Sequence, residues 1–191
     1  MRAVAAAAGV AEKTVYLQFD TKSALLKAVV ENAIVGDDED VPAAGRDWFV
    51  EAVAQTDLDR KLRQIAALTS ALHERSGAIF AVARDAASVD PEIANLWAYG
   101  KRGHRADMTV LARSFAECGL LPPGLDLAWA TTTLYVLLGP EAWHLTRTEL
   151  QLDENGYHDW LLSQLRQAFR GDDAAPTRFG NRTSNDNSDM D

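Results

Sequence analysis

Apolar side chains recur every three to four residues along most of this chain, and this spacing constrains the fold more than any other feature. One stripe at helical spacing consists of Leu58, Leu62, Ile65, Leu68 and Leu72. A second consists of Ile93, Trp97, Gly100, His104, Leu111 and Phe115. The alternating β-branched and aromatic blocks of a β-sandwich are absent, so the pattern predicts an all-α protein.

Capping and breaking residues divide the pattern into helices. Asp90 and Pro91 are typical of a helix start, and Gly119 is typical of the end of the same helix. Gly77 predicts an interruption, with a short helix running on to about residue 87. We expect further helices over residues 125–138, 140–149 and 153–169.

Changes in composition along the chain predict four parts. Residues 1–35 form a small head, an acidic linker spans 36–45, and a body extends over 46–170. Residues 171–191 are rich in polar residues and predict a disordered tail. The chain has a net charge of −9, but the head carries four bases and three acids, a net charge of +1. A weakly basic head on an acidic body permits DNA binding without proving it.

The cysteine content and hydropathy exclude several classes of protein. A single cysteine, Cys118, excludes an intramolecular disulfide framework and a cysteine-rich zinc site. The longest apolar stretch, residues 127–138, contains threonines and is too short to span a bilayer. These features predict a cytoplasmic protein without membrane association.

Residues 4–10 (VAAAAGV) have the layout of a helix-turn-helix. Gly9 is suited to the turn, and the small Ala5 allows the second helix to cross closely. We expect Val4, Val10 and Val15 to fill the seam between the helices. An alanine followed by a glycine four residues later is a weak signal in an alanine-rich chain, so the neighbouring residues decide.

The string GVAEKTVYLQFDTKSALLKAV at residues 9–29 closely resembles the signature of the TetR family of transcriptional regulators. In that signature a glycine turn leads to a recognition helix ending in Tyr-x-x-Phe, and a helix with a Lys and a Leu-Leu pair follows. The matching positions here are Thr14, Tyr16, Phe19, Lys22, Leu25 and Leu26. The resemblance is specific over residues 2–35 and looser over the body, where residues 137–145 (LLGPEAWHL) are consistent with it.

The resemblance implies that Glu12, Lys13, Thr14 and Gln18 face the edge of the DNA groove, whereas Tyr16 and Lys22 hold phosphates. Without the motif, the two lysines would be solvated charges and Tyr16 a packing residue. The predicted DNA-binding set is Arg2, Ala11, Glu12, Lys13, Thr14, Tyr16, Gln18 and Lys22.

The chain departs from the family pattern at its start. Family members carry a further helix before the segment that opens this chain, and that helix contributes phosphate contacts. The sequence therefore predicts an incomplete head that exposes Val4, Val15 and Phe19 and binds DNA poorly unless upstream residues are added. The alternative function is a dimeric ligand-binding protein without competent DNA binding.

By the same resemblance, the body binds a small, mostly apolar effector and forms a homodimer. Candidate ligand-binding residues are Trp97, His104, Met108, Phe115, Trp129, Tyr135 and Trp143. Each of them is also compatible with a place in the core, because aromatic residues at helical spacing are more often core. Asp107 is placed to fix the tautomer of His104.

The predicted dimer face belongs to the last two helices and consists of Leu134, Leu138, Trp143, Leu161, Leu165 and Ala168. Such a dimer would place two recognition helices about 34–36 Å apart on a near-palindromic operator. Effector and DNA would then bind different conformations, and the effector would release a repressor.

An enzyme is the rival class. Glu141 and His144 form one Glu-x-x-His half-site of the kind found in di-iron bundles, but no second half-site is present. No nucleophile elbow, phosphate loop or dinucleotide fingerprint occurs either. We therefore expect no enzymatic activity, no metal and no cofactor.

Overall fold

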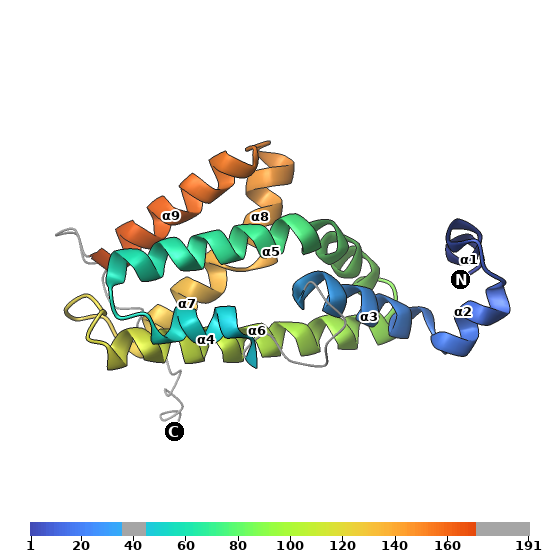
Figure 1. Ribbon diagram of the computed structural model, residues 1–191, viewed down its shortest axis with the longest axis horizontal. Helices are drawn as coiled ribbons and strands as arrows, with labels where there is room; N and C mark the ends of the chain where they lie inside the picture. Colours follow the sequence, from blue (N-terminus) through green and yellow to red (C-terminus); the bar gives the residue numbers. More distant parts are fainter. Residues whose placement is uncertain (36–44, 171–191) are drawn as a thin grey trace, which may run out of the picture.

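A computed structural model describes residues 1–35 and 45–170 of the chain (Figure 1). Every regular element in this part is a helix, which confirms the all-α class. The elements are α1 (Arg2–Ala8), α2 (Glu12–Gln18), α3 (Lys22–Val35), α4 (Asp47–Ala54), α5 (Leu58–Ala87), α6 (Pro91–Glu117), α7 (Leu127–Leu137), α8 (Pro140–Trp143), the π-helix η2 (His144–Glu149) and α9 (Glu154–Arg170). The predicted tail and most of the predicted linker lie outside the described residues.

The two long helices α5 and α6 form the frame of the body and are joined by a short turn (Figure 1). The Asp90 side chain ends this turn by accepting hydrogen bonds from the backbone N–H groups of Glu92 and Ile93, at 2.9 and 3.3 Å. Asp90 is therefore the N-cap of α6, and Pro91 takes the first helical position, as the sequence predicted.

The predicted interruption at Gly77 is wrong, because α5 continues without a break to Ala87. Gly77 is buried, and a Cβ atom added there would overlap the six-membered ring of Trp143. The absence of a side chain at Gly77 thus allows α5 and the segment after α7 to pack closely together. At this contact Trp143 Nε1 also donates to Glu74 Oε1 at 3.3 Å.

The core of the body lies between α5, α6, α7 and α9, with α4 closing one side (Figure 1). Phe115 and Phe169 are fully or nearly fully buried, and their ring centroids lie 4.5 Å apart. Lys61 is also fully buried, and its Nζ donates to the carbonyls of Val53 and Gln55 at 2.8 and 3.0 Å. This lysine ties the end of α4 to α5 through two backbone oxygens.

The predicted dimer face needs correction. Four of its leucines (Leu134, Leu138, Leu161 and Leu165) are buried inside this single chain. Trp143 and Ala168 are half-buried and pack against the same core. The apolar spacing of α7 and α9 thus reflects packing within one protomer, and the four buried leucines are not available to a second copy.

Candidate functional site: a cavity beneath α3 and a projecting helix

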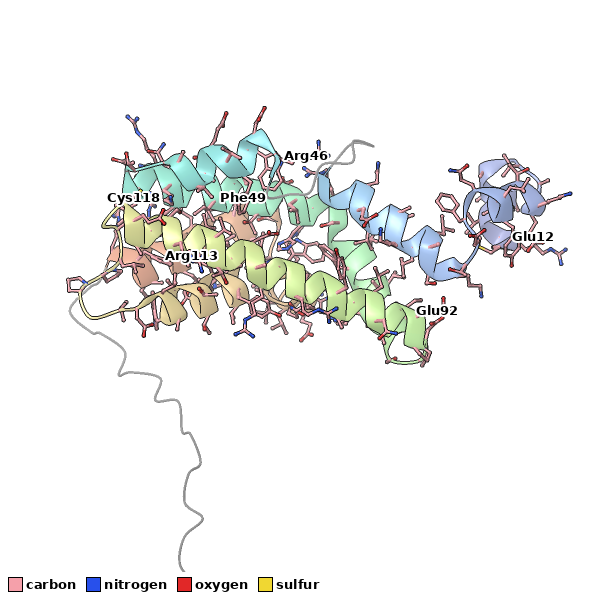
Figure 2. All side chains as sticks on the ribbon, turned by 90° about the horizontal axis from the view of Figure 1, so that it is seen from below. Glu12, Arg46, Phe49, Glu92, Arg113 and Cys118 are labelled. Carbon is pink, nitrogen blue, oxygen red and sulfur yellow. The ribbon has the colours of Figure 1, made fainter. Side chains whose placement is uncertain are left out.

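A cavity of about 780 Å³ lies between the helices of the body and is bordered by α3, α4, α5 and α6. Its lining is mostly apolar and includes Phe49, Leu72, Phe80 and Leu111. The volume falls in the range of about 300–1,000 Å³ that is usual for small-molecule sites. In Figure 2 the labelled Phe49 extends from α4 toward the interior of the body.

The structure divides the predicted ligand-binding residues into two groups. Trp97, His104 and Met108 line the cavity. Phe115 and Trp129 do not, and both pack against Phe169 in the core. Tyr135 and Trp143 are not part of the lining either. The ring of Tyr135 lies beside that of His104, with centroids 5.0 Å apart and the planes tilted by 34°, and Trp143 covers Gly77.

The orientation of His104 comes from a backbone carbonyl and not from Asp107. His104 Nε2 lies 3.2 Å from the carbonyl oxygen of Tyr135, which can only accept, so Nε2 is the protonated nitrogen. Burial lowers the pKa of His104, although the hydrogen bond to Tyr135 opposes this shift. A neutral ring with its proton on Nε2 presents Nδ1 as a hydrogen-bond acceptor.

Asp107 lines the cavity three residues after His104, and the structure gives its carboxylate no hydrogen bond or ion pair. Burial raises the pKa of this carboxyl group. The predicted contact between Asp107 and His104 is therefore absent, and both residues present free acceptors on one face of α6.

The cationic residues that line the cavity are already paired with acids. Lys101 Nζ donates to Glu141 Oε1 at 2.6 Å and also lies 4.7 Å from the ring centroid of Tyr135. Lys27 Nζ is 2.6 Å from Glu31 Oε1, one helical turn further along α3. Neither lysine was predicted as a site residue. The sequence feature that could have indicated Lys101 is its position as a charged residue next to the apolar stripe of α6.

His73 forms the cavity wall on the side of α5. Its Nδ1 lies 3.1 Å from the hydroxyl oxygen of Tyr157 on α9, and its ring is almost fully buried. Burial is the main cause that lowers the pKa of His73 to about 3, so the ring is neutral at physiological pH.

The head begins with two short helices joined at a left-handed glycine. Gly9 ends α1 with φ 68° and ψ 25°, and its N–H donates to the carbonyl of Ala6 at 3.3 Å. The next N–H, that of Val10, donates to the carbonyl of Ala5 at 3.0 Å. This closed turn sets the direction of α2, which lies with α1 at one end of the molecule, away from the body (Figure 1).

The interior of the head is small. Ala5 and Val15 are its buried residues, 3 % and 7 % exposed, and they pack where α1 crosses α2. Val15 thus fills the seam as predicted, but Val4 and Val10 are exposed. Of the three residues that an incomplete head was expected to expose, Val4 is exposed, Phe19 is half-buried and Val15 is buried, so the expectation is wrong for Val15.

Helix α3 joins this head to the body. Thr21 Oγ1 accepts the N–H of Ala24 at 3.0 Å and so caps α3. The hydroxyl of Ser23 donates to the Glu92 carboxylate at the start of α6. Figure 2 shows Glu92 at the end of α6 nearest the head and Cys118 at the opposite end. Further along, α3 packs on α5 and α6 and forms part of the cavity wall.

Comparison with known protein families identifies the head. Residues 1–29 match the family of bacterial regulatory proteins named tetR. The first 29 residues are therefore similar to the head of TetR-family regulators. The match covers α1, α2 and the first part of α3, and it supports a DNA-binding, regulatory head. Comparisons with curated proteins and with solved structures give no match.

The predicted DNA-binding residues of this TetR-like head are all exposed. Helix α2 presents Glu12, Lys13, Thr14, Tyr16 and Gln18 to solvent, and Val15 is its buried residue. The remaining members are Arg2 on α1, Ala11 at the N-cap of α2 and Lys22 at the start of α3. In Figure 2 the labelled Glu12 lies on the outlying pair of helices. Residues 12–18 therefore form the projecting helix that the TetR-like signature predicted.

The described part of the chain contains no group of three or more side chains placed to hold a metal ion. Within it, Glu141 bonds Lys101, and His144 Nε2 lies 3.4 Å from an Arg84 nitrogen. No helix among the described residues is long and apolar enough to cross a membrane.

Proposed function

We propose that this chain is a ligand-responsive regulator of transcription, and not an enzyme, whose DNA affinity falls when a small molecule fills the cavity. One observation carries the proposal: α3 belongs both to the DNA-binding head and to the wall of the cavity. Lys27, Ala28, Val30, Glu31 and Asn32 of α3 border the cavity. A ligand in the cavity therefore contacts α3, the helix that connects the DNA-binding helix α2 to the body.

On the DNA side, α2 is the helix that enters the major groove. The ammonium of Lys13 suits the acceptors of guanine, and the Gln18 amide suits adenine. Tyr16 and Lys22 hold phosphates, and Lys22 does so at the start of α3, where backbone N–H groups also favour an anion. These assignments use the exposed residues of the projecting helix and its neighbour.

The DNA and ligand sites are coupled through the position of α3. The position that α3 takes beside an empty cavity is the one that places α2 in the DNA groove. A ligand that prefers another position of α3 weakens DNA binding, and DNA weakens ligand binding to the same degree. A coupling free energy of about 1–3 kcal/mol corresponds to roughly a 5–150-fold change in operator affinity.

We further propose that the regulator acts as a homodimer on a near-palindromic operator, since two heads are needed to contact successive major grooves. The buried leucines of α7 and α9 are excluded from the dimer interface. We place this interface on the exposed residues of the same two helices, among them Val136, which is 59 % exposed. Sedimentation analysis of the purified chain tests the dimer.

The DNA-binding part is tested by selecting bound duplexes from a random pool and then measuring affinity for the selected sequence by fluorescence anisotropy. We expect Lys13→Ala to cost about 1–3 kcal/mol and to relax specificity at one base pair. Lys22→Ala should weaken all sequences alike and reduce the salt slope by about one. Arg113→Ala is the matched control, since it also replaces an exposed positive charge by alanine, at the far end of α6 (Figure 2).

Two outcomes of this experiment count against the proposal. If no sequence is enriched, the head does not recognise DNA, and the chain is a ligand-binding protein without a functional DNA-binding head. If a sequence is enriched but a saturating cavity ligand leaves its affinity unchanged, the coupling through α3 is wrong.

A further inference from the structure

The polar groups that line the cavity define the chemistry of its ligand. Of the described acidic and basic residues in the lining, Lys27 is paired with Glu31 and Lys101 with Glu141. Asp107 alone among them has no partner. The remaining free charge in an otherwise apolar site is therefore a carboxylate.

His104 adds a second acceptor next to this carboxylate. Its Nε2–H is used by the carbonyl of Tyr135, so Nδ1 is the nitrogen left for a ligand. His104 and Asp107 are three positions apart on α6, and both line the cavity. Two acceptors one helical turn apart match the several N–H donors of a single ammonium group.

We propose that the ligand of this cavity is a lipophilic amine, cationic at neutral pH, whose ammonium group binds Asp107 and His104 while its apolar body fills the space between α4, α5 and α6. This inference rests on the proposed function, because it assigns a ligand class to the same cavity. It goes beyond that function by naming the charge of the ligand and the residues that recognise it.

Other ligand classes fit the same groups less well. A neutral apolar ligand would remove water from the Asp107 carboxylate without replacing its hydrogen bonds. A carboxylic acid would place a second negative charge beside Asp107 and would have to displace Glu141 to reach Lys101. An ammonium group forms a charge-assisted hydrogen bond with Asp107, and the apolar lining of the cavity accommodates the rest of the molecule.

The test uses three compounds with one skeleton: 4-phenylbutylamine, 4-phenylbutanol and 4-phenylbutanoate. Their affinities for the full chain are measured at pH 7 by isothermal titration calorimetry, and quenching of tryptophan fluorescence is followed as a second signal because Trp48 and Trp97 line the cavity. We expect the amine to bind about tenfold or more tightly than the alcohol, and the acid to bind most weakly.

Asp107→Asn removes the charge and keeps the shape of the side chain. We expect it to lower the affinity for the amine by about 10–100-fold, to the level of the alcohol, and to change the affinity for the alcohol by less than about threefold. Glu117→Gln is the matched control, since Glu117 is exposed on the same helix, does not line the cavity and loses the same charge. It should leave all three affinities unchanged.

The outcomes separate this inference from the proposed function. If the alcohol or the acid binds the wild-type chain as well as the amine does, the amine class is wrong and the ligand-binding cavity stands. If Asp107→Asn retains the affinity for the amine, Asp107 is not the recognition group and the inference is overturned. If none of the three compounds binds, both the inference and the ligand-binding part of the proposed function fail. The wild-type comparison decides the question even if the variant does not fold.

Discussion

His73 makes the stability of this protein depend on pH in a way that can be calculated from its surroundings. The ring is buried against Tyr157 and Phe80, and burial lowers its pKa from 6.5 to about 3. In the unfolded chain the same ring takes up a proton near pH 6.5, whereas the folded protein does not. Because the unfolded state binds more protons below pH 6.5, stability is fully present above that pH and is lost as the pH falls toward 3.

The size of the effect follows from the separation of the two pKa values. Each pH unit below 6.5 costs about 1.4 kcal/mol while the unfolded ring is protonated and the folded ring is not. Between pH 7 and pH 5 the loss attributable to His73 is therefore about 2 kcal/mol. His104 changes stability in the same direction because burial lowers its pKa too, so the wild-type loss exceeds this value.

The measurement compares wild type with His73→Gln, which keeps a hydrogen-bonding group toward Tyr157 and removes the titration. Urea unfolding followed by circular dichroism at pH 7, 6 and 5 gives the free energy of unfolding of each. We expect the advantage of wild type over the variant to shrink by about 2 kcal/mol between pH 7 and pH 5. A difference that stays constant within about 0.5 kcal/mol across this range would refute the linkage argument.

Three further predictions concern the body and are checked by the same unfolding measurement at pH 7. Gly77→Ala should destabilise by about 1–3 kcal/mol through overlap with Trp143, and the same change should become stabilising in a Trp143→Leu background; no change of sign would mean that the ring is not the obstacle. Lys61→Met should cost about 1–3 kcal/mol, because two backbone carbonyls lose their donor, and an unaffected stability would show that water replaces it. Asp90→Ala should cost about 1 kcal/mol by removing the cap of α6, whereas a neutral result would contradict the capping role.

Features that depend on neighbouring residues were predictable from the sequence. The cap at Asp90, the left-handed turn at Gly9 and the apolar stripe of α6 all appear in the structure where the pattern placed them. The TetR-like string was equally local, and the family match covers the same segment. Local propensity and capping are physical properties of short stretches, so they can be evaluated without knowing the tertiary fold.

Features that depend on distant residues were not predictable. Glycine has a low helix propensity, so Gly77 was interpreted as a helix breaker. Its role in the structure comes from Trp143, which packs on it from another part of the chain. Periodicity placed Phe115 and Trp97 on one face of α6 without indicating that the first is fully buried in the core and the second borders a cavity. The tautomer of His104 is likewise set by a carbonyl on α7, which no spacing on α6 reveals.

The short connection between α2 and α3 gives the proposed coupling a physical route. α2 ends at Gln18 and α3 begins at Lys22, so few residues are available to absorb a change in the angle between them. The Thr21 cap fixes the start of α3, and the bond from Ser23 to Glu92 ties that start to α6, the helix that supplies Asp107 and His104 to the cavity. A ligand held by α6 that displaces α3 would therefore also displace α2, and the displacement grows with distance from the contact because α2 lies at the outer end of the molecule. Breaking the Ser23–Glu92 bond with Ser23→Ala should weaken this transmission: ligand affinity should be retained while the ligand's effect on DNA affinity decreases. An undiminished effect would place the coupling elsewhere.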